Sequence, residues 1–268
     1  MKVETYLVDS FTDTAFKGNP AGVCLVEESL SDAQMQNIAK ELGLSETAFV
    51  QGTDSMYTIR YFSPKMEIPL CGHATLASAK ILFDKYPTIK NISFKTIEEL
   101  HLEVTRKGEE IEMEFPIYTT VPQNAPTALL SALGITEIVN SEYNAETNIL
   151  LVEIENAEIL RNLNPDFERL VSTHNAINGV LVTARSKEKK YDFESRYFWP
   201  WSGTNEDPVT GGTHTFLAKY WSARLGKQKM ESFQCSKRSG FMQVELIGEE
   251  KMKIRSQAQI ILKGELYV

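Results

Sequence analysis

The chain has 268 residues, and its 42% hydrophobic and 24% charged residues are ordinary globular usage, which excludes a disordered chain. Its formal net charge of −8, without a basic run, disfavours nucleic acid or a membrane surface as a partner. No apolar stretch approaches the roughly 20 residues of a membrane span, and the first residues alternate like a strand rather than a signal peptide. We therefore expect a cytoplasmic protein.

Cysteine usage bounds the chemistry further. The chain has three cysteines, Cys24, Cys71 and Cys235, an odd number without paired spacing. This pattern argues against a disulfide scaffold and against a zinc site, so we expect no metal.

The first half of the chain predicts two helices and a hairpin. A surface helix is expected over 31–42, with Ser31 as a plausible N-cap. A second helix, over about 73–85, carries small or apolar residues on most faces, which is typical of a buried helix. Residues 100–115 alternate on both sides of a turn at Lys107-Gly108, which indicates a hairpin with one solvated face.

The second half predicts the same kinds of element in the same order. A surface helix is expected over about 165–172, and a buried helix over about 213–225. A hairpin with its turn at Gly248 follows. The stretch 118–126, with two prolines and few core residues, separates the halves.

Three short matches relate the two halves. Arg60–Pro64 (RYFSP) recurs as RYFWP, CGHAT is echoed by GGTHT, and GEE recurs, at offsets of 136, 140 and 140 residues. A shared order at a nearly constant offset indicates a duplicated unit. We predict an α+β protein of two similar pseudo-symmetric domains, 1–118 and 119–268. Each would be a curved, barrel-like, mostly antiparallel sheet wrapped around a central helix.

The turns before the two buried helices are candidate anion sites. Backbone N–H groups and the helix dipole at an N-terminus favour a carboxylate or phosphate, and Gly72 and Gly211-Gly212 would let a ligand approach closely. If a pseudo-twofold axis relates the halves, both turns can face one cleft. The alternative is that these glycines only make tight turns.

Titratable residues gather at the same turns. His73 would be held neutral by the helix dipole, and it could contact a substrate or only hydrogen-bond within the turn. Cys71 could be a base or nucleophile, or a small buried filler. Asp207, before Pro208, could be a turn cap. Glu46 begins a predicted strand, while the equivalent segment 176–182 has no acid, which predicts a one-base site.

The chain resembles the PhzF-like (phenazine biosynthesis-like) family, which shares its fold with diaminopimelate epimerase. Four segments carry the resemblance, in the family's order over most of the chain: 8–23, 44–49, 71–75 and 205–211. The resemblance implies two similar domains with the site between them. It also implies no cofactor and often a homodimer.

The resemblance also implies residue roles. The family's catalytic glutamate falls on Glu46 as general acid/base, its site histidine on His73 and its site aspartate on Asp207. Gly212 stands where the family often has serine. The epimerase branch uses two cysteines, and only Cys71 matches one of them. The positions expected to bind substrate are Asn19, Ser45, Gly72, Gly211, Gly212 and Thr213.

The sequence thus favours a cofactor-independent isomerase of PhzF type. Glu46 alone would move a proton on a small carboxylate-containing substrate in the interdomain cleft. Two alternatives stay open: a two-base amino-acid epimerase or racemase, and a non-catalytic small-molecule-binding protein.

Overall fold

The computed structural model describes residues 1–53, 55–173 and 176–268. The chain divides into two compact units: unit 1 is Met1–Glu114 with Ile254–Val268, and unit 2 is Phe115–Lys253. The division predicted from the sequence, 1–118 and 119–268, differs from these units mainly in the C-terminal residues. Residues 254–268 belong to unit 1 because strand β18 (Ala258–Tyr267) pairs along the whole of β1 (Lys2–Ser10).

Unit 1 is a mixed, mostly antiparallel sheet with two helices. The order β18–β1–β2 is antiparallel, β2–β3 is parallel, β3–β4 is antiparallel, β4–β6 is parallel and β6–β7–β8 is antiparallel, while short β5 pairs with the end of β4. The further elements are β2 (Asn19–Leu25), α1 (Asp32–Leu42), β3 (Thr47–Thr53), β4 (Met56–Phe62), β5 (Glu67–Ile68), α2 (Gly72–Lys85), β6 (Asn91–Lys95), β7 (His101–Lys107) and β8 (Glu110–Pro116).

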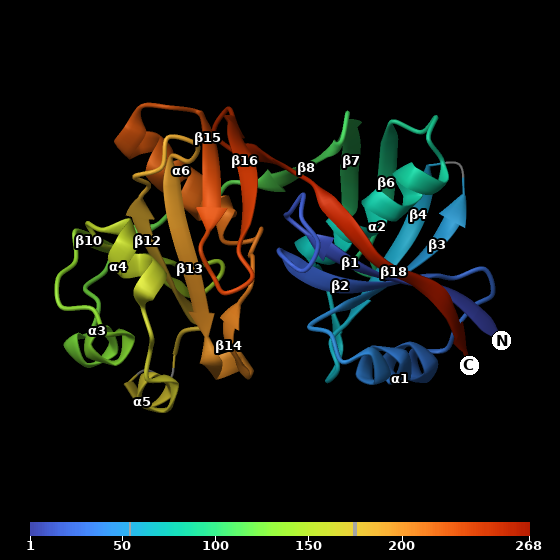
Figure 1. Cartoon of the computed structure of the whole chain (residues 1–268), viewed down its shortest axis with the longest axis horizontal. Helices are drawn as coiled ribbons and strands as arrows, with labels where there is room; N and C mark the ends of the chain where they lie inside the picture. The colour runs from blue at the N-terminus through green and yellow to red at the C-terminus, as the bar shows by residue number, and fades with distance from the viewer. Residues whose placement is uncertain (54, 174–175) are drawn as a thin grey trace. The chain divides into compact units, whose positions relative to one another are not determined.

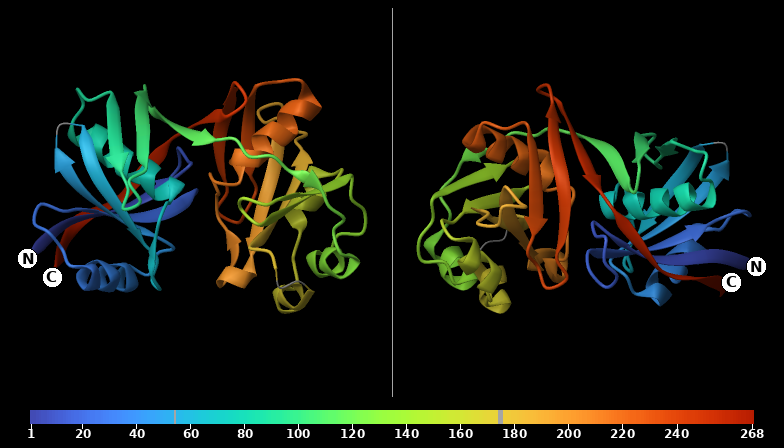
Figure 2. Two further views of the ribbon diagram at one scale, coloured as in Figure 1. Left: turned by 180° about the vertical axis from the view of Figure 1, so that it is seen from behind. Right: turned by 45° about the horizontal axis from the view of Figure 1, so that its top comes forward.

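Helix α2 is the centre of unit 1. It packs against β1, β2, β3 and β18, and ten of its fourteen residues are buried, which confirms the predicted buried helix. Figure 1 shows α2 among the strands of unit 1, and Figure 2 shows β18 beside β1 from two further directions. Small residues such as Ala74, Ala77 and Ala79 allow the strands to approach the helix on several sides.

Helix α1 covers a separate apolar layer of unit 1. Ser31 is its N-cap and forms a capping box with Gln34, and Gly43 ends the helix in the left-handed conformation. Met35 and Ile38 pack with Phe49 and other residues of β1–β4 in one buried cluster. The predicted surface helix over 31–42 is therefore confirmed.

Unit 2 has strands of the same kinds in the same order. Strands β9–β10–β11 are antiparallel, β11–β12 is parallel, β12–β13–β14 is antiparallel, β13–β15 is parallel and β15–β16 is antiparallel. The elements are β9 (Val121–Pro122), α3 (Thr127–Leu133), β10 (Asn140–Asn144), β11 (Ile149–Glu153), α4 (Ala157–Asn162), α5 (Phe167–Thr173), β12 (Gly179–Arg185), β13 (Phe193–Trp199), β14 (Thr204–Asp207), α6 (His214–Leu225), β15 (Lys229–Gln234) and β16 (Gly240–Ile247). Strand β17 (Lys251–Ser256) begins in unit 2 and ends in unit 1.

The repeated RYF-x-P segments make the same interactions in both units. In unit 1, Arg60 Nε and Nη2 each lie 2.7 Å from a carboxylate oxygen of Glu67 on β5. In unit 2, Arg196 Nε and Nη2 lie 2.7 and 2.8 Å from the oxygens of Glu206 on β14. These two-point ion pairs fix the return of the chain from the long strand to the turn before each central helix. The fold is thus α+β, with two similar units.

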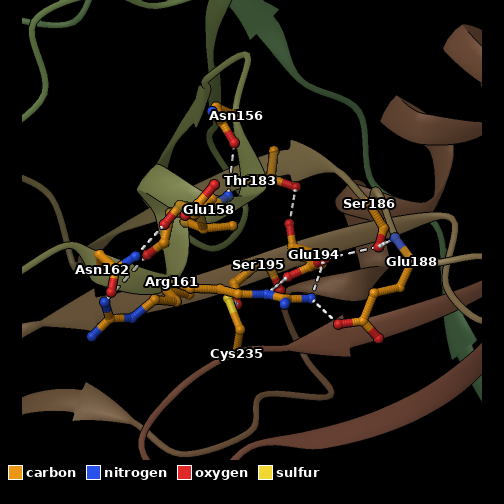
Figure 3. A network of polar contacts seen from close by, with 12 residues as sticks. Asn156, Glu158, Arg161, Asn162, Thr183, Ser186, Glu188, Glu194, Ser195 and Cys235 are labelled. Carbon is orange, nitrogen blue, oxygen red and sulfur yellow. Dashed lines mark hydrogen bonds and ion pairs between the residues drawn. The ribbon is translucent and has the colours of Figure 1, made fainter.

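Unit 2 also buries a carboxylate that ties α4 to β13. The fully buried Glu194 accepts hydrogen bonds of 2.6 and 2.7 Å from Arg161 and one of 2.8 Å from Ser186 Oγ (Figure 3). Several donors therefore compensate the buried charge of Glu194. Removal of one of them would leave this charge partly uncompensated and would destabilise the fold.

Helix α6 is the central helix of unit 2. It packs against β15 and β16, and Trp221 stacks on Phe193 of β13 with ring centroids 5.6 Å apart. Its first residue, His214, is fully buried, with Nδ1 3.0 Å from Thr210 O and Nε2 2.7 Å from Ser232 Oγ. Burial lowers the pKa of His214 from 6.5 to about 4.

This depressed pKa predicts acid sensitivity of unit 2. Between pH 6.5 and about 4 the unfolded chain binds a proton at His214 that the folded chain does not, so stability falls as pH falls through this window. The expected loss is roughly 3 kcal/mol. All three tryptophans lie in unit 2, so tryptophan fluorescence during urea unfolding reports this unit.

His214→Gln should flatten the decline in the free energy of unfolding between pH 7 and pH 4. His101→Gln, at an exposed histidine of unit 1, is the matched control and should leave the slope unchanged. An equal slope in the His214 variant would show that other groups cause the acid sensitivity.

Candidate functional site

Three side chains of unit 1 meet at the N-terminus of α2. Glu46 directly precedes β3, Cys71 is the N-cap residue of α2, and His73 lies in its first turn. One carboxylate oxygen, the thiol sulfur and one imidazole nitrogen all lie within 4.8 Å of one another. The structure therefore brings together the predicted acid/base, Glu46, and the predicted site histidine, His73. It adds Cys71, for which the sequence left open a chemical role or a filling role.

The imidazole of His73 lies between the other two groups. Its Nε2 is 3.3 Å from Glu46 Oε2, and its Nδ1 is 3.4 Å from Cys71 Sγ. The side chains of His73 and Glu46 are 10% and 13% exposed, so both are largely removed from water while part of each remains accessible. Interactions among these polar groups are stronger here than on an open surface.

Strand pairing explains how Glu46 reaches the helix. Strands β2 and β3 are parallel with Gly22 opposite Thr47, and the Gly22 N–H donates to the Glu46 carbonyl over 3.1 Å. A Cβ on Gly22 would lie 2.8 Å from Thr47 Oγ1, so only glycine allows this close approach. On the helix side, Ser10 Oγ at the end of β1 donates to the His73 carbonyl over 2.7 Å.

Burial sets the charge of the imidazole. Desolvation lowers the pKa of His73, and the opposing attraction of the Glu46 carboxylate only partly offsets it. A neutral ring that donates its Nε2 proton to Glu46 presents Nδ1 as an acceptor toward the Cys71 thiol. In this arrangement the ring donates a hydrogen bond through Nε2 and accepts one through Nδ1.

Of the other predicted positions of unit 1, Ser45 and Gly72 adjoin the cluster in sequence, and Asn19 lies on β2. Asn19 begins β2, opposite Ser10, and is fully buried. Ser45 is exposed beside Glu46, and Gly72 is the first residue of α2. Their contact with a substrate stays a prediction.

In unit 2, Asp207 ends β14 and is held by the loop that follows it. Thr210 Oγ1 donates to Asp207 Oδ2 over 2.5 Å, and Gln234 Nε2 donates to the Asp207 carbonyl over 2.7 Å. Gln234 also accepts from the Thr210 N–H over 2.9 Å. Burial, reinforced by the Asp207 charge, raises the pKa of Tyr197, the strand neighbour of Asp207.

The second glycine turn leads directly into α6. Thr213 is the buried N-cap residue, and its Oγ1 donates to the Thr210 carbonyl over 3.0 Å. A Cβ on Gly212 would meet nothing within 4 Å, so a serine side chain at this position would have room. Asp207 and the 211–213 turn thus form one hydrogen-bonded segment of unit 2. Their predicted meeting with Glu46 and His73 at a shared cleft stays a prediction.

Sequence reasoning missed the supports beneath the cluster. Thr75 Oγ1 donates to the Cys71 carbonyl over 2.8 Å and lies 2.6 Å from the Tyr61 hydroxyl. Tyr61 is part of the repeated RYF-x-P segment, but the repeat did not indicate that its hydroxyl would meet α2. Only the wrapping of the sheet around the helix brings these two residues together.

The fold and these motifs are those of a known family. The family model described as "Phenazine biosynthesis-like protein" matches residues 8–264, and the chain belongs to this family. It is 41% identical, over the full length of both chains, to a Pseudomonas aeruginosa protein described as an uncharacterized isomerase.

Solved structures show the same architecture. A PhzF family phenazine biosynthesis protein of Enterococcus faecalis covers all of both chains, with 36% identity and a TM-score of 0.92. A probable proline racemase of Agrobacterium radiobacter K84, crystallised with bound carbonate, covers 99% of this chain and 92% of its own. Its TM-score is 0.61 at 9% identity, a likeness of fold alone. Among the described residues, no helix is long and apolar enough to cross a membrane.

The support beneath Cys71 can be tested by a pair of substitutions on α2. Thr75→Val keeps the shape of the side chain but leaves the buried Tyr61 hydroxyl without this partner. We expect a loss of about 1–3 kcal/mol in the free energy of unfolding, measured by urea denaturation.

Ser78→Ala is the matched control, because the Ser78 hydroxyl donates only to the Ala74 carbonyl one turn earlier in the same helix. It should cost less than about 1 kcal/mol. Equal losses in the two variants would mean that the Tyr61–Thr75 contact does not support the helix N-terminus.

Proposed function

We propose that this protein is a cofactor-independent isomerase in which Glu46 alone moves a proton on a small carboxylate-containing substrate. The observation that carries the proposal is the partly buried Glu46 carboxylate, 3.3 Å from the imidazole of His73 at the start of a buried helix. The description of the Pseudomonas aeruginosa relative as an isomerase supports the reaction class.

The proposed reaction is a proton shift without redox change. The Glu46 carboxylate removes a proton from a carbon next to a carboxyl-activated or unsaturated centre, and the electron pair moves toward that centre. Glu46, now protonated, returns the proton to another carbon on the same face of the substrate. Substrate and product are therefore isomers, and no further reactant is needed.

The start of α2 supplies the stabilisation that such a carbanion needs. Backbone N–H groups in the first turn, at Gly72 and His73, have no partner within the helix and point outward with the positive end of the dipole. The neutral His73 ring, which donates its single N–H to Glu46, holds that carboxylate beside these backbone donors. In a site largely removed from water these donors stabilise developing negative charge more than water would.

Unit 2 is proposed to orient the substrate. Asp207 would attract a positively charged group such as an amine, and the N–H groups of Gly211, Gly212 and Thr213 would hold a carboxylate. Asn19 and Ser45 would complete the contacts from unit 1. The homodimer that the resemblance implies remains an expectation.

A two-base epimerase or racemase needs a second proton-transfer group on the opposite face of the substrate carbon. Cys71 does not suit this role, because its sulfur and the Glu46 carboxylate are both within reach of the same imidazole. Two proton-transfer groups on opposite faces of one substrate carbon would be roughly 6 Å apart, whereas these two lie within 4.8 Å of each other. This geometry favours transfer by one base over inversion between Cys71 and Glu46.

The acid/base role is tested by Glu46→Gln, which keeps shape and hydrogen bonding but cannot carry a proton. A panel of small unsaturated and α-amino carboxylic acids is incubated in D2O with chelator, and deuterium incorporation and isomer formation are followed by proton NMR. We expect kcat to fall about 10²–10⁴-fold, with ligand affinity little changed.

Glu41→Gln, at an exposed glutamate of α1, is the control and should retain wild-type turnover. Cys71→Ala should lower kcat only modestly. Wild-type exchange in the Glu46 variant would refute the proposal, while loss of inversion at a chiral carbon in Cys71→Ala would favour the two-base epimerase. Binding of a panel member without any exchange by the wild-type protein would favour a non-catalytic binder.

A further inference from the structure

We propose that Glu46, Cys71 and His73 also form a binding site for a thiophilic divalent cation of the Zn²⁺ type, and that this cation reversibly blocks the site. The inhibitory consequence rests on the proposed function, but binding of the cation does not. The inference departs from the expectation of no metal, which came from the lack of paired cysteines.

The donor set matches the preference of such a cation. Thiolate sulfur, imidazole nitrogen and carboxylate oxygen are the three ligand types that proteins offer to Zn²⁺. Among the described residues, these three form the one group of three or more His, Cys, Asp or Glu side chains with converging ligand atoms. Mg²⁺ and Ca²⁺, which prefer oxygen ligands, would not be held by a site with one carboxylate.

The spacing also matches a tetrahedral site. With metal–ligand bonds of about 2.0–2.3 Å, ligand atoms around a tetrahedral cation lie roughly 3.3–3.6 Å apart. His73 Nε2 lies 3.3 Å from Glu46 Oε2 and 3.9 Å from Cys71 Sγ. All three ligand atoms lie within 4.8 Å of one another, so side-chain movements of roughly 1 Å would let one cation contact all three.

Charge balance favours the bound state. A thiolate and a carboxylate together neutralise a divalent cation, which lowers the cost of holding it where water is scarce. Three protein ligands leave the fourth position for water or for a ligand carboxylate.

The consequence for the proposed reaction is direct. A cation that holds the Glu46 carboxylate occupies the electron pair that would accept the substrate proton. Proton exchange should therefore stop when the site is filled and return when a chelator removes the cation.

The test uses the full-length protein, stripped with chelator and reduced, and titrated with Co²⁺ in the absence of substrate. A cobalt–thiolate bond gives a near-ultraviolet charge-transfer band, which reports the bond itself rather than activity. We expect a band that saturates at one equivalent, disappears on addition of Zn²⁺ and persists on addition of Mg²⁺.

Variants identify the ligands. Cys71→Ala should abolish the band, and Glu46→Gln and His73→Gln should each weaken Co²⁺ binding at least about tenfold. Cys235→Ala removes another buried thiol, one that lies in the core of unit 2, and should leave the band unchanged. Far-ultraviolet circular dichroism checks that each variant is folded.

The outcomes separate this inference from the proposed function. No band in the wild type, or a band that survives Cys71→Ala or is unaffected by both ligand variants, overturns the metal site. A band with the expected pattern supports it even if Glu46→Gln retains proton exchange, in which case only the proposed function fails. Zn²⁺ that binds but leaves proton exchange intact refutes the inhibitory part.

Discussion

The burial of the N-terminus of α2 inside its own sheet is the constraint on which the site depends. Strands β2 and β3 run parallel beside the helix, and this pairing places Glu46 near the turn where Cys71 and His73 begin the helix. Burial then acts on the chemistry, because it lowers the pKa of His73 and removes most of the water around Glu46. The burial of this turn thus determines both how its side chains pack and how readily they ionise.

The repeated architecture shows which features are structural. Both units keep the two-point Arg–Glu pair, at Arg60 and at Arg196, before the central helix. They differ where chemistry is expected, because unit 2 has Thr213 at the position of His73 and no acid in the segment that corresponds to Glu46. The shared parts shape the helix N-terminus, whereas the side chains at these two positions differ between the units.

The sequence predicted the elements that depend on local patterns. Buried helices, hairpins and the repeat were visible in periodicity and spacing, and the motifs pointed to Glu46 and His73. The contact of Cys71 with His73 and the support by Thr75 and Tyr61 were not predictable, because they depend on how the sheet curves around α2. The pairing of β18 with β1 likewise joins the two ends of the chain, a contact that no local pattern encodes.

The two carboxylates proposed to act on the substrate, Asp207 and Glu46, differ in how they are bound, and this difference fits the two tasks proposed for them. The Asp207 carboxylate accepts a hydrogen bond from Thr210 within a segment that Gln234 fixes to β15, so its position is set before any ligand arrives. Such a group suits fixed electrostatic orientation. Glu46 faces a neutral ring across 3.3 Å, and a proton can be gained or lost there without breaking a network of several donors. A reaction in which Asp207 orients and Glu46 transfers the proton therefore uses each carboxylate in the state that its surroundings stabilise.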